Sequence, residues 1–158
     1  MASSFDKFLK DKAKHAVAGS TKLLATMGGK HIVNIEAAAD IDNGAIIGKG
    51  AFVDWEYYAE GECGAFSGVI LGQAANGNWY VEVSEAQNAF LVLTVPVIYE
   101  NYTKGLTDES NFYNAKGDIM RCYELAVNDI FELSAEGFSG TPVAGSTVSV
   151  SGKKVTVA

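Results

Sequence analysis

Short runs of β-branched and aromatic residues, separated by turn residues at intervals of about ten, fill the sequence from His31 to the C-terminus. Closely spaced strands joined by tight turns build antiparallel sheets, whereas parallel sheets need helices between their strands. No alternation of strands with ten-residue helical patterns follows residue 30. We therefore predict an all-β fold, an antiparallel sandwich or a barrel-like body, preceded by a short N-terminal amphipathic helix or arm.

Two hairpins are predicted from their turn residues, because glycine and asparagine accept the positive φ that tight turns require. The first turn is Asn76-Gly77-Asn78, between strands expected at residues 69–71 and 79–83. The second is Ser151-Gly152-Lys153, between the last two expected strands of the chain. These turns fix the pairing of neighbouring strands locally.

Two further runs predict which side chains are buried. Phe52–Tyr58 alternates, and we assign Val53, Trp55 and Tyr57 to the core face of one strand. Ala89–Tyr99 is the most apolar stretch of the chain, which is typical of a strand covered on both faces.

The sequence contains no motif that specifies catalysis or metal binding. The glycine-rich stretch Gly44–Gly50 lacks the spacing of a phosphate loop and is interpreted as a hairpin turn. His15 and His31 have no partner at a recognisable metal-ligand or triad spacing. Asp54 and Glu56 are interpreted as a solvated pair on one strand face, since alternation alone produces such pairs. We expect no enzymatic activity, no metal and no cofactor.

The two cysteines, Cys63 and Cys122, lie far apart and form no CxxC motif. A chain of this size buries enough surface to fold without disulfides or a structural metal. We interpret both thiols as small apolar side chains, a usage that suits a reducing compartment.

Charge is unevenly distributed along the chain. The protein has 12 basic and 19 acidic residues, a net charge of −7, which disfavours general nucleic-acid binding. The first 30 residues contain six lysines and two aspartates, whereas the remaining 128 residues contain six basic and seventeen acidic side chains. A basic N-terminal segment therefore precedes an acidic body.

Residues 4–18 are predicted to form an amphipathic helix within that basic segment. Phe5, Phe8 and Leu9 follow the i, i+3, i+4 spacing of one helical face, while lysines occupy the other. Gly19 is the expected C-cap. A helix this short is marginal in water, so we expect it to form where its apolar face is covered.

Residues 19–30 are then expected to be a flexible tether, which divides the chain into residues 1–30 and a single β-rich domain at 31–158. The apolar face of the helix should be buried against this domain or another chain, because two phenylalanines and a leucine left in water would promote aggregation. An anionic membrane surface is disfavoured since it would repel the acidic body. No signal peptide or membrane span is expected.

Five segments resemble the head decoration proteins of tailed bacteriophages, also called capsid auxiliary proteins, which are encoded beside the major capsid protein. In chain order these segments are Asn88–Val92, Pro96–Glu100, Phe112–Gly117, Arg121–Leu125 and Val127–Phe131. The resemblance extends from about residue 31 to the end of the chain and includes no invariant chemical motif.

The resemblance implies a structural virion protein, made in the host bacterial cytoplasm and located on the outer surface of the capsid. Its partners would be the major capsid protein and neighbouring copies of itself, with no nucleic acid and no membrane. The residues that we expect to make these contacts are Phe5, Lys7, Phe8, Leu9, Lys10, Lys12 and Lys14.

The alternative function is that of a carbohydrate-binding β module displayed on the virion. Sugars stack on exposed aromatic rings, and Tyr58 and Tyr80 are the candidates. This alternative predicts a coplanar aromatic shelf on the surface.

Overall fold

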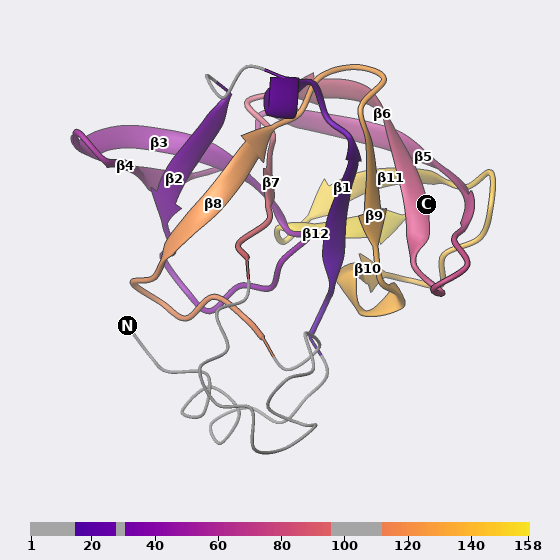
Figure 1. The fold of residues 1–158 in the computed structure, drawn as a ribbon. Helices are drawn as coiled ribbons and strands as arrows, with labels where there is room; N and C mark the ends of the chain where they lie inside the picture. The colour runs from indigo at the N-terminus through magenta and orange to yellow at the C-terminus, as the bar shows by residue number, and fades with distance from the viewer. Residues whose placement is uncertain (1–14, 28–30, 96–111) are drawn as a thin grey trace.

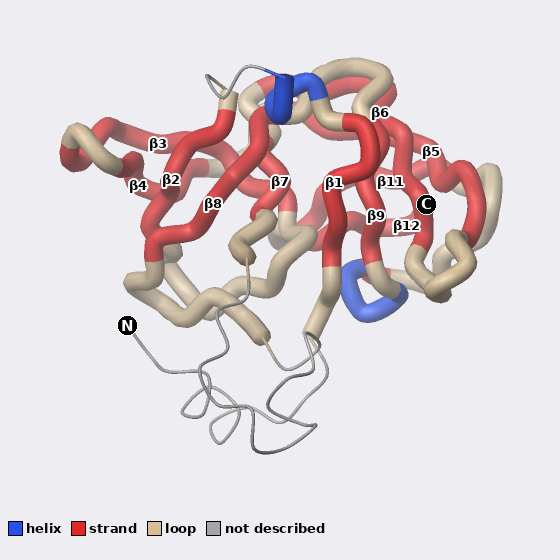
Figure 2. The backbone as a smooth tube through the Cα atoms, in the orientation of Figure 1, coloured by secondary structure: helices blue, strands red, loops and turns tan. Residues whose placement is uncertain are grey.

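The computed structural model describes residues 15–27, 31–95 and 112–158. The prediction of an all-β, barrel-like fold is confirmed: one sheet has seven strands, and five other strands close into a barrel (Figures 1 and 2). The strands are β1 (Ala18–Lys22), β2 (Ile32–Glu36), β3 (Ile46–Asp54), β4 (Tyr57–Gly61), β5 (Ala65–Gln73), β6 (Trp79–Gln87), β7 (Phe90–Val92), β8 (Ile119–Glu124), β9 (Ile130–Leu133), β10 (Phe138–Ser139), β11 (Thr147–Ser151) and β12 (Lys154–Val157). Two short 3-10 helices are η1 (Leu24–Met27) and η3 (Ala135–Gly137).

The seven-stranded sheet has the order β1-β9-β6-β5-β11-β12-β10 and is antiparallel except for the β10–β12 pair. Its strands bury alternate side chains, as the period of two requires. Ile70, Val81, Phe131 and Leu133 are fully buried in the core beneath this sheet.

The barrel has the order β2-β4-β3-β7-β8, with β2 and β4 parallel. It encloses a second cluster of buried side chains that includes Ile35, Met120 and Cys122. Each of these three side chains is completely inaccessible to solvent.

Strands β3 and β7 form a wall that both cores share. Ile46 and Leu91 are buried in the core of the sheet, whereas Ile47, Phe90 and Val92 are buried in the barrel. Because neighbouring residues of one strand face opposite ways, this wall has two dry faces and makes the barrel and the sheet a single body. The prediction that the apolar stretch beginning at Ala89 is buried on both faces is confirmed for its described strand, β7.

Both predicted hairpins are confirmed. Strands β5 and β6 meet at a turn in which Gly77 has φ of +90°. Strands β11 and β12 meet where Gly152 and Lys153 have φ of +59° and +68°. Two consecutive positive φ angles match the right-handed twist of paired strands.

The prediction of a flexible tether at residues 19–30 is wrong for its described part, residues 19–27, which form β1, the buried Leu23 and η1. Ala18–Lys22 is strand β1, which pairs with β9 at the end of the seven-stranded sheet, so the helix does not extend to Ala18 and Gly19 is not its C-cap. The physical reason is burial: Ala16 and Leu23 on either side of β1 belong to the sheet core. The rest of the predicted helix, residues 4–14, lies outside the described residues.

The interpretation of Gly44–Gly50 as a hairpin turn is wrong, because this stretch runs into β3. Gly44 has φ of +88° and precedes the strand, and Gly48 and Gly50 lie within it. A Cβ at Gly50 would meet the carbonyl oxygen of Ala59 at 2.9 Å, so the glycines permit the close approach of β4.

The predicted core face of Phe52–Tyr58 is also wrong. The chain reverses at Trp55 and Glu56, and the β3–β4 hairpin projects beyond the rest of the barrel (Figure 1). Val53 is 53% exposed and Trp55 81% exposed, while Tyr57 is half-buried. Side chains at the end of a projecting hairpin have no second layer to cover, whatever their alternation.

Candidate functional site

The predicted partner-binding residues all lie outside the described part of the chain, which begins at His15. They are Phe5, Lys7, Phe8, Leu9, Lys10, Lys12 and Lys14. What the structure does define is how the body holds the chain directly after these residues.

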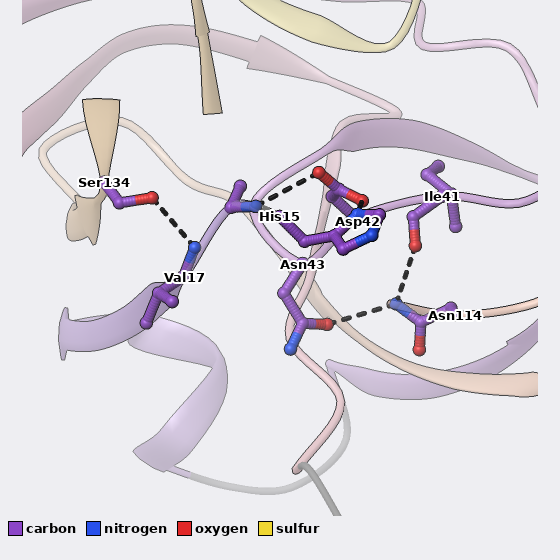
Figure 3. Close-up of polar contacts among 8 residues, drawn as sticks. His15, Val17, Ile41, Asp42, Asn43, Asn114 and Ser134 are labelled. Carbon is purple, nitrogen blue, oxygen red and sulfur yellow. Dashed lines mark hydrogen bonds and ion pairs between the residues drawn. The ribbon is translucent and has the colours of Figure 1, made fainter. Parts of the chain in front are cut away.

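His15 is fixed to the body by Asp42, which lies between β2 and β3 (Figure 3). Its Nδ1 lies 2.6 Å from Asp42 Oδ1, and the backbone amide of Ala16 donates to Asp42 Oδ2 at 3.1 Å. The ring of His15 also stacks on Tyr113, with centroids 4.7 Å apart. One carboxylate therefore holds both the side chain and the backbone of the first described residues.

Val17 is fixed to Ser134, the residue directly after β9. Val17 donates its amide to Ser134 Oγ at 2.9 Å (Figure 3), and the Ser134 amide donates to the Val17 carbonyl at 2.8 Å. These two bonds lead directly into the pairing of Ala18 with Leu133 in β1 and β9. The chain is thus anchored before its first strand begins.

Two asparagines connect this anchor to the segments on either side of residues 96–111. Asn43 accepts a hydrogen bond from the Thr94 amide at 3.0 Å and donates to the Thr94 carbonyl at 2.8 Å. Asn114, 1% exposed, donates to Asn43 Oδ1 and to the carbonyl of Ile41, each at 3.2 Å (Figure 3). We call His15, Asp42, Asn43, Tyr113 and Asn114 the anchor cluster.

The sequence did not reveal the anchor cluster. The predicted helix over residues 4–18 includes His15, and the sequence indicates only a turn at Asp42-Asn43-Gly44. Asp42-Asn43-Gly44 does turn the chain, but its side chains also bind segments that are distant in sequence. Residue alternation does not indicate such contacts, because they depend on tertiary structure.

We expect the Asp42→Ala substitution to lower the free energy of unfolding by about 2–3 kcal/mol, because it leaves His15 and the Ala16 amide without their shared acceptor. Ser134→Ala should cost about 1 kcal/mol, since it removes a single neutral acceptor. Urea unfolding measures both values. Glu85→Ala, at an exposed carboxylate of β6, is the matched control and should change stability by less than about 0.5 kcal/mol. Equal effects of the Asp42 and Glu85 substitutions would contradict the anchoring role.

A second polar contact joins the barrel to the sheet. The ammonium of Lys153, in the β11–β12 turn, contacts the carboxylate of Glu60 in β4. The Glu60 side chain is 6% exposed. The Lys153 carbonyl also accepts from the Ile46 amide at 3.0 Å. Because a buried carboxylate needs a partner of opposite charge, the contact between Lys153 and Glu60 is explained by the fold alone.

The cysteines are free thiols, as interpreted from the sequence: Cys122 is buried and Cys63 is half-buried. Burial, with a smaller contribution from the charge of Glu60, raises the pKa of Cys122 far above its ordinary value. Burial alone raises the pKa of Cys63. Neither thiol is activated as a nucleophile, which would require a lowered pKa.

This burial predicts a pH dependence of stability. Above the ordinary thiol pKa of 9.0, Cys122 keeps its proton in the folded state and loses it in the unfolded state. Unfolding then releases a proton, and the free energy of unfolding should fall by up to about 1.4 kcal/mol per pH unit from this group. Urea titrations between pH 8 and 10 should show a shallower decline for Cys122→Ala than for the wild type. Identical slopes would contradict the predicted shift.

The aromatic residues considered for sugar binding do not form a flat shelf at Tyr58. Tyr58 is half-buried, and its ring meets Phe52 edge-on at an interplanar angle of 69°. The ammonium of Lys49 lies 4.6 Å from the centroid of the Tyr58 ring and covers one face of that ring. Tyr80 is likewise half-buried, in β6.

Comparison of the chain with protein-family models, with curated proteins and with solved structures gives no match. Within residues 15–27, 31–95 and 112–158, no three His, Cys, Asp or Glu side chains are grouped to hold a metal ion. No helix in the same ranges has the length and apolar character to span a membrane.

Proposed function

We propose that this protein is a structural virion protein that binds the outer surface of a phage capsid and decorates or reinforces it through non-covalent contacts. The anchor cluster carries the proposal: it holds the chain rigidly at His15, immediately after the basic and apolar segment that we expect to bind. A contact made by residues 1–14 is thereby transmitted to a folded body instead of a loose tether.

Charge supports a protein partner. Residues 1–14 contain four lysines and two aspartates, whereas the rest of the chain contains eight basic and seventeen acidic residues. The segment is therefore attracted to acidic protein surfaces that repel the body, which orients the protein on its partner. The major capsid protein and neighbouring copies of the chain are the proposed partners, and no bond is made or broken.

The repeated geometry of a capsid also supports this function. A lattice presents many identical sites at fixed spacing, so that weak individual contacts suffice when neighbouring copies also touch. The shared β3–β7 wall gives each copy a body that keeps its shape as it binds.

The test is co-sedimentation with empty heads assembled from the major capsid protein of the same genome. We expect saturable binding with a fixed ratio of this protein to capsid subunits, and no binding to unassembled capsid protein. Recovery of the protein in the supernatant at every concentration would contradict the proposed function.

A further inference from the structure

The end of the β3–β4 hairpin is a continuous exposed surface with large apolar side chains. Six consecutive residues, 51–56, are exposed. Among them Phe52 is 59%, Val53 53% and Trp55 81% exposed. We call these six residues the hairpin tip.

The tip is held firmly at its base. Beta strands 3 and 4 pair from Gly48–Gly61 to Asp54–Tyr57, with two irregularities in register that increase twist. Below the tip, Lys49 lies over the Tyr58 ring, and Phe52 of the tip meets the same ring at 5.2 Å between centroids. A tip that is rigid before binding loses little conformational entropy when it binds.

Such a surface is costly unless something covers it. Exposed contiguous apolar side chains mark interaction sites in folded proteins, and tryptophan is the residue most enriched among those that dominate binding energy. In Figure 1 the hairpin extends away from the other strands of the barrel, which suits insertion into a concave partner.

Charge decides the chemistry of that partner. The two charged residues of the tip, Asp54 and Glu56, are both acidic and exposed on either side of Trp55. The body of a second copy, in which residues 15–158 contain eight basic and seventeen acidic side chains, and an anionic membrane would both repel the tip. The complementary surface is a protein groove with an apolar floor and a rim of lysine or arginine.

We propose that the hairpin tip is a second capsid contact, inserting Trp55 and Phe52 into a basic-rimmed apolar groove of the assembled capsid protein. This inference rests on the proposed function and adds to it a described surface, separate from residues 1–14. The protein would then attach at two points, by its N-terminal segment and by the tip.

The test compares the full-length double variant Phe52→Ser/Trp55→Ser with Leu71→Ser/Val143→Ser. The control side chains are 48% and 55% exposed, so the two variants lose apolar surface of a similar kind at different places. With thermal unfolding confirming that both are folded, we expect the tip variant to bind empty heads at least about tenfold more weakly, and the control to bind as the wild type does. Asp54→Lys/Glu56→Lys should also weaken binding, because it repels a basic rim.

A photo-crosslinking residue at position 53 identifies what the tip touches. We expect a cross-link to the capsid subunit, and none from position 143. Cross-linking to a second copy, binding of the tip to anionic vesicles, or wild-type affinity of the tip variant would overturn the inference. If the wild type binds heads and the tip variant binds equally well, only the inference fails. If the wild type does not bind heads, the proposed function fails as well.

Discussion

Deleting residues 2–14 should strongly weaken binding to assembled heads while leaving the body folded. The deletion joins Met1 to His15 and removes Phe5, Phe8, Leu9 and four lysines. Truncating apolar and charged contacts of this number should weaken binding by roughly a hundredfold or more. Co-sedimentation with empty heads measures the loss.

The structure specifies where this deletion must end. His15 contacts Asp42, and Ala16 belongs to the core of the sheet, so a deletion that continued to residue 18 would also damage the body. With His15 retained, the midpoint of thermal unfolding should stay within about 3 °C of the wild type. Full binding by the folded, shortened protein would contradict the assigned role of the segment.

The dependence of binding on salt concentration distinguishes the charged component of this contact from the apolar one. Replacing Lys7, Lys10, Lys12 and Lys14 with serine should weaken binding at low ionic strength and make the remaining affinity less sensitive to salt. Replacing Phe5 and Phe8 with serine should weaken binding at every salt concentration, since apolar burial does not depend on screening.

Gly48→Ala should be the most destabilising single substitution that we predict. A Cβ at this position in β3 would collide with the backbone carbonyl of Glu62 and lie 2.9 Å from Asn88 Nδ2. Asn88 in turn donates to the Glu62 carbonyl at 3.3 Å and accepts from the Lys49 amide at 3.2 Å, so neither neighbour is free to move. We expect a loss of about 3–5 kcal/mol, or failure to fold.

Gly72→Ala provides the matched control. Gly72 also lies within a strand, β5, but a Cβ there meets no atom within 4 Å, and its φ is not positive. This substitution should change the free energy of unfolding by less than about 1 kcal/mol, because the added methyl group restricts the unfolded chain without a clash. Urea unfolding measures the free energy of unfolding of Gly48→Ala and Gly72→Ala. Similar values for the two variants would contradict the close approach at Gly48.

Local chemistry explains which parts of the fold were predictable. The Gly77 and Gly152 hairpins depend on turn residues and on strands that are adjacent in sequence, so both follow from the sequence. Strand β1 pairs with β9, and Ala18 meets Leu133 across more than a hundred residues. Nothing in the residues near Ala18 indicates that partner, which is why this segment was expected to be a helix end and a tether.

The sequence also does not indicate which side chains at the end of a hairpin are buried. Alternation in Phe52–Tyr58 indicates a strand but does not specify how far the hairpin extends beyond the body. Trp55 was therefore expected in the core, although it is 81% exposed. The same limit applies to the anchor cluster, where His15 reaches Asp42 only through the tertiary fold.

Electron cryomicroscopy of heads with and without the bound protein tests the central claim most directly. We predict difference density on the outer surface at repeated lattice positions, with the β body above the shell and the chain before His15 in contact with the capsid subunit. Difference density inside the shell, or none at saturating protein, would contradict a decorating role.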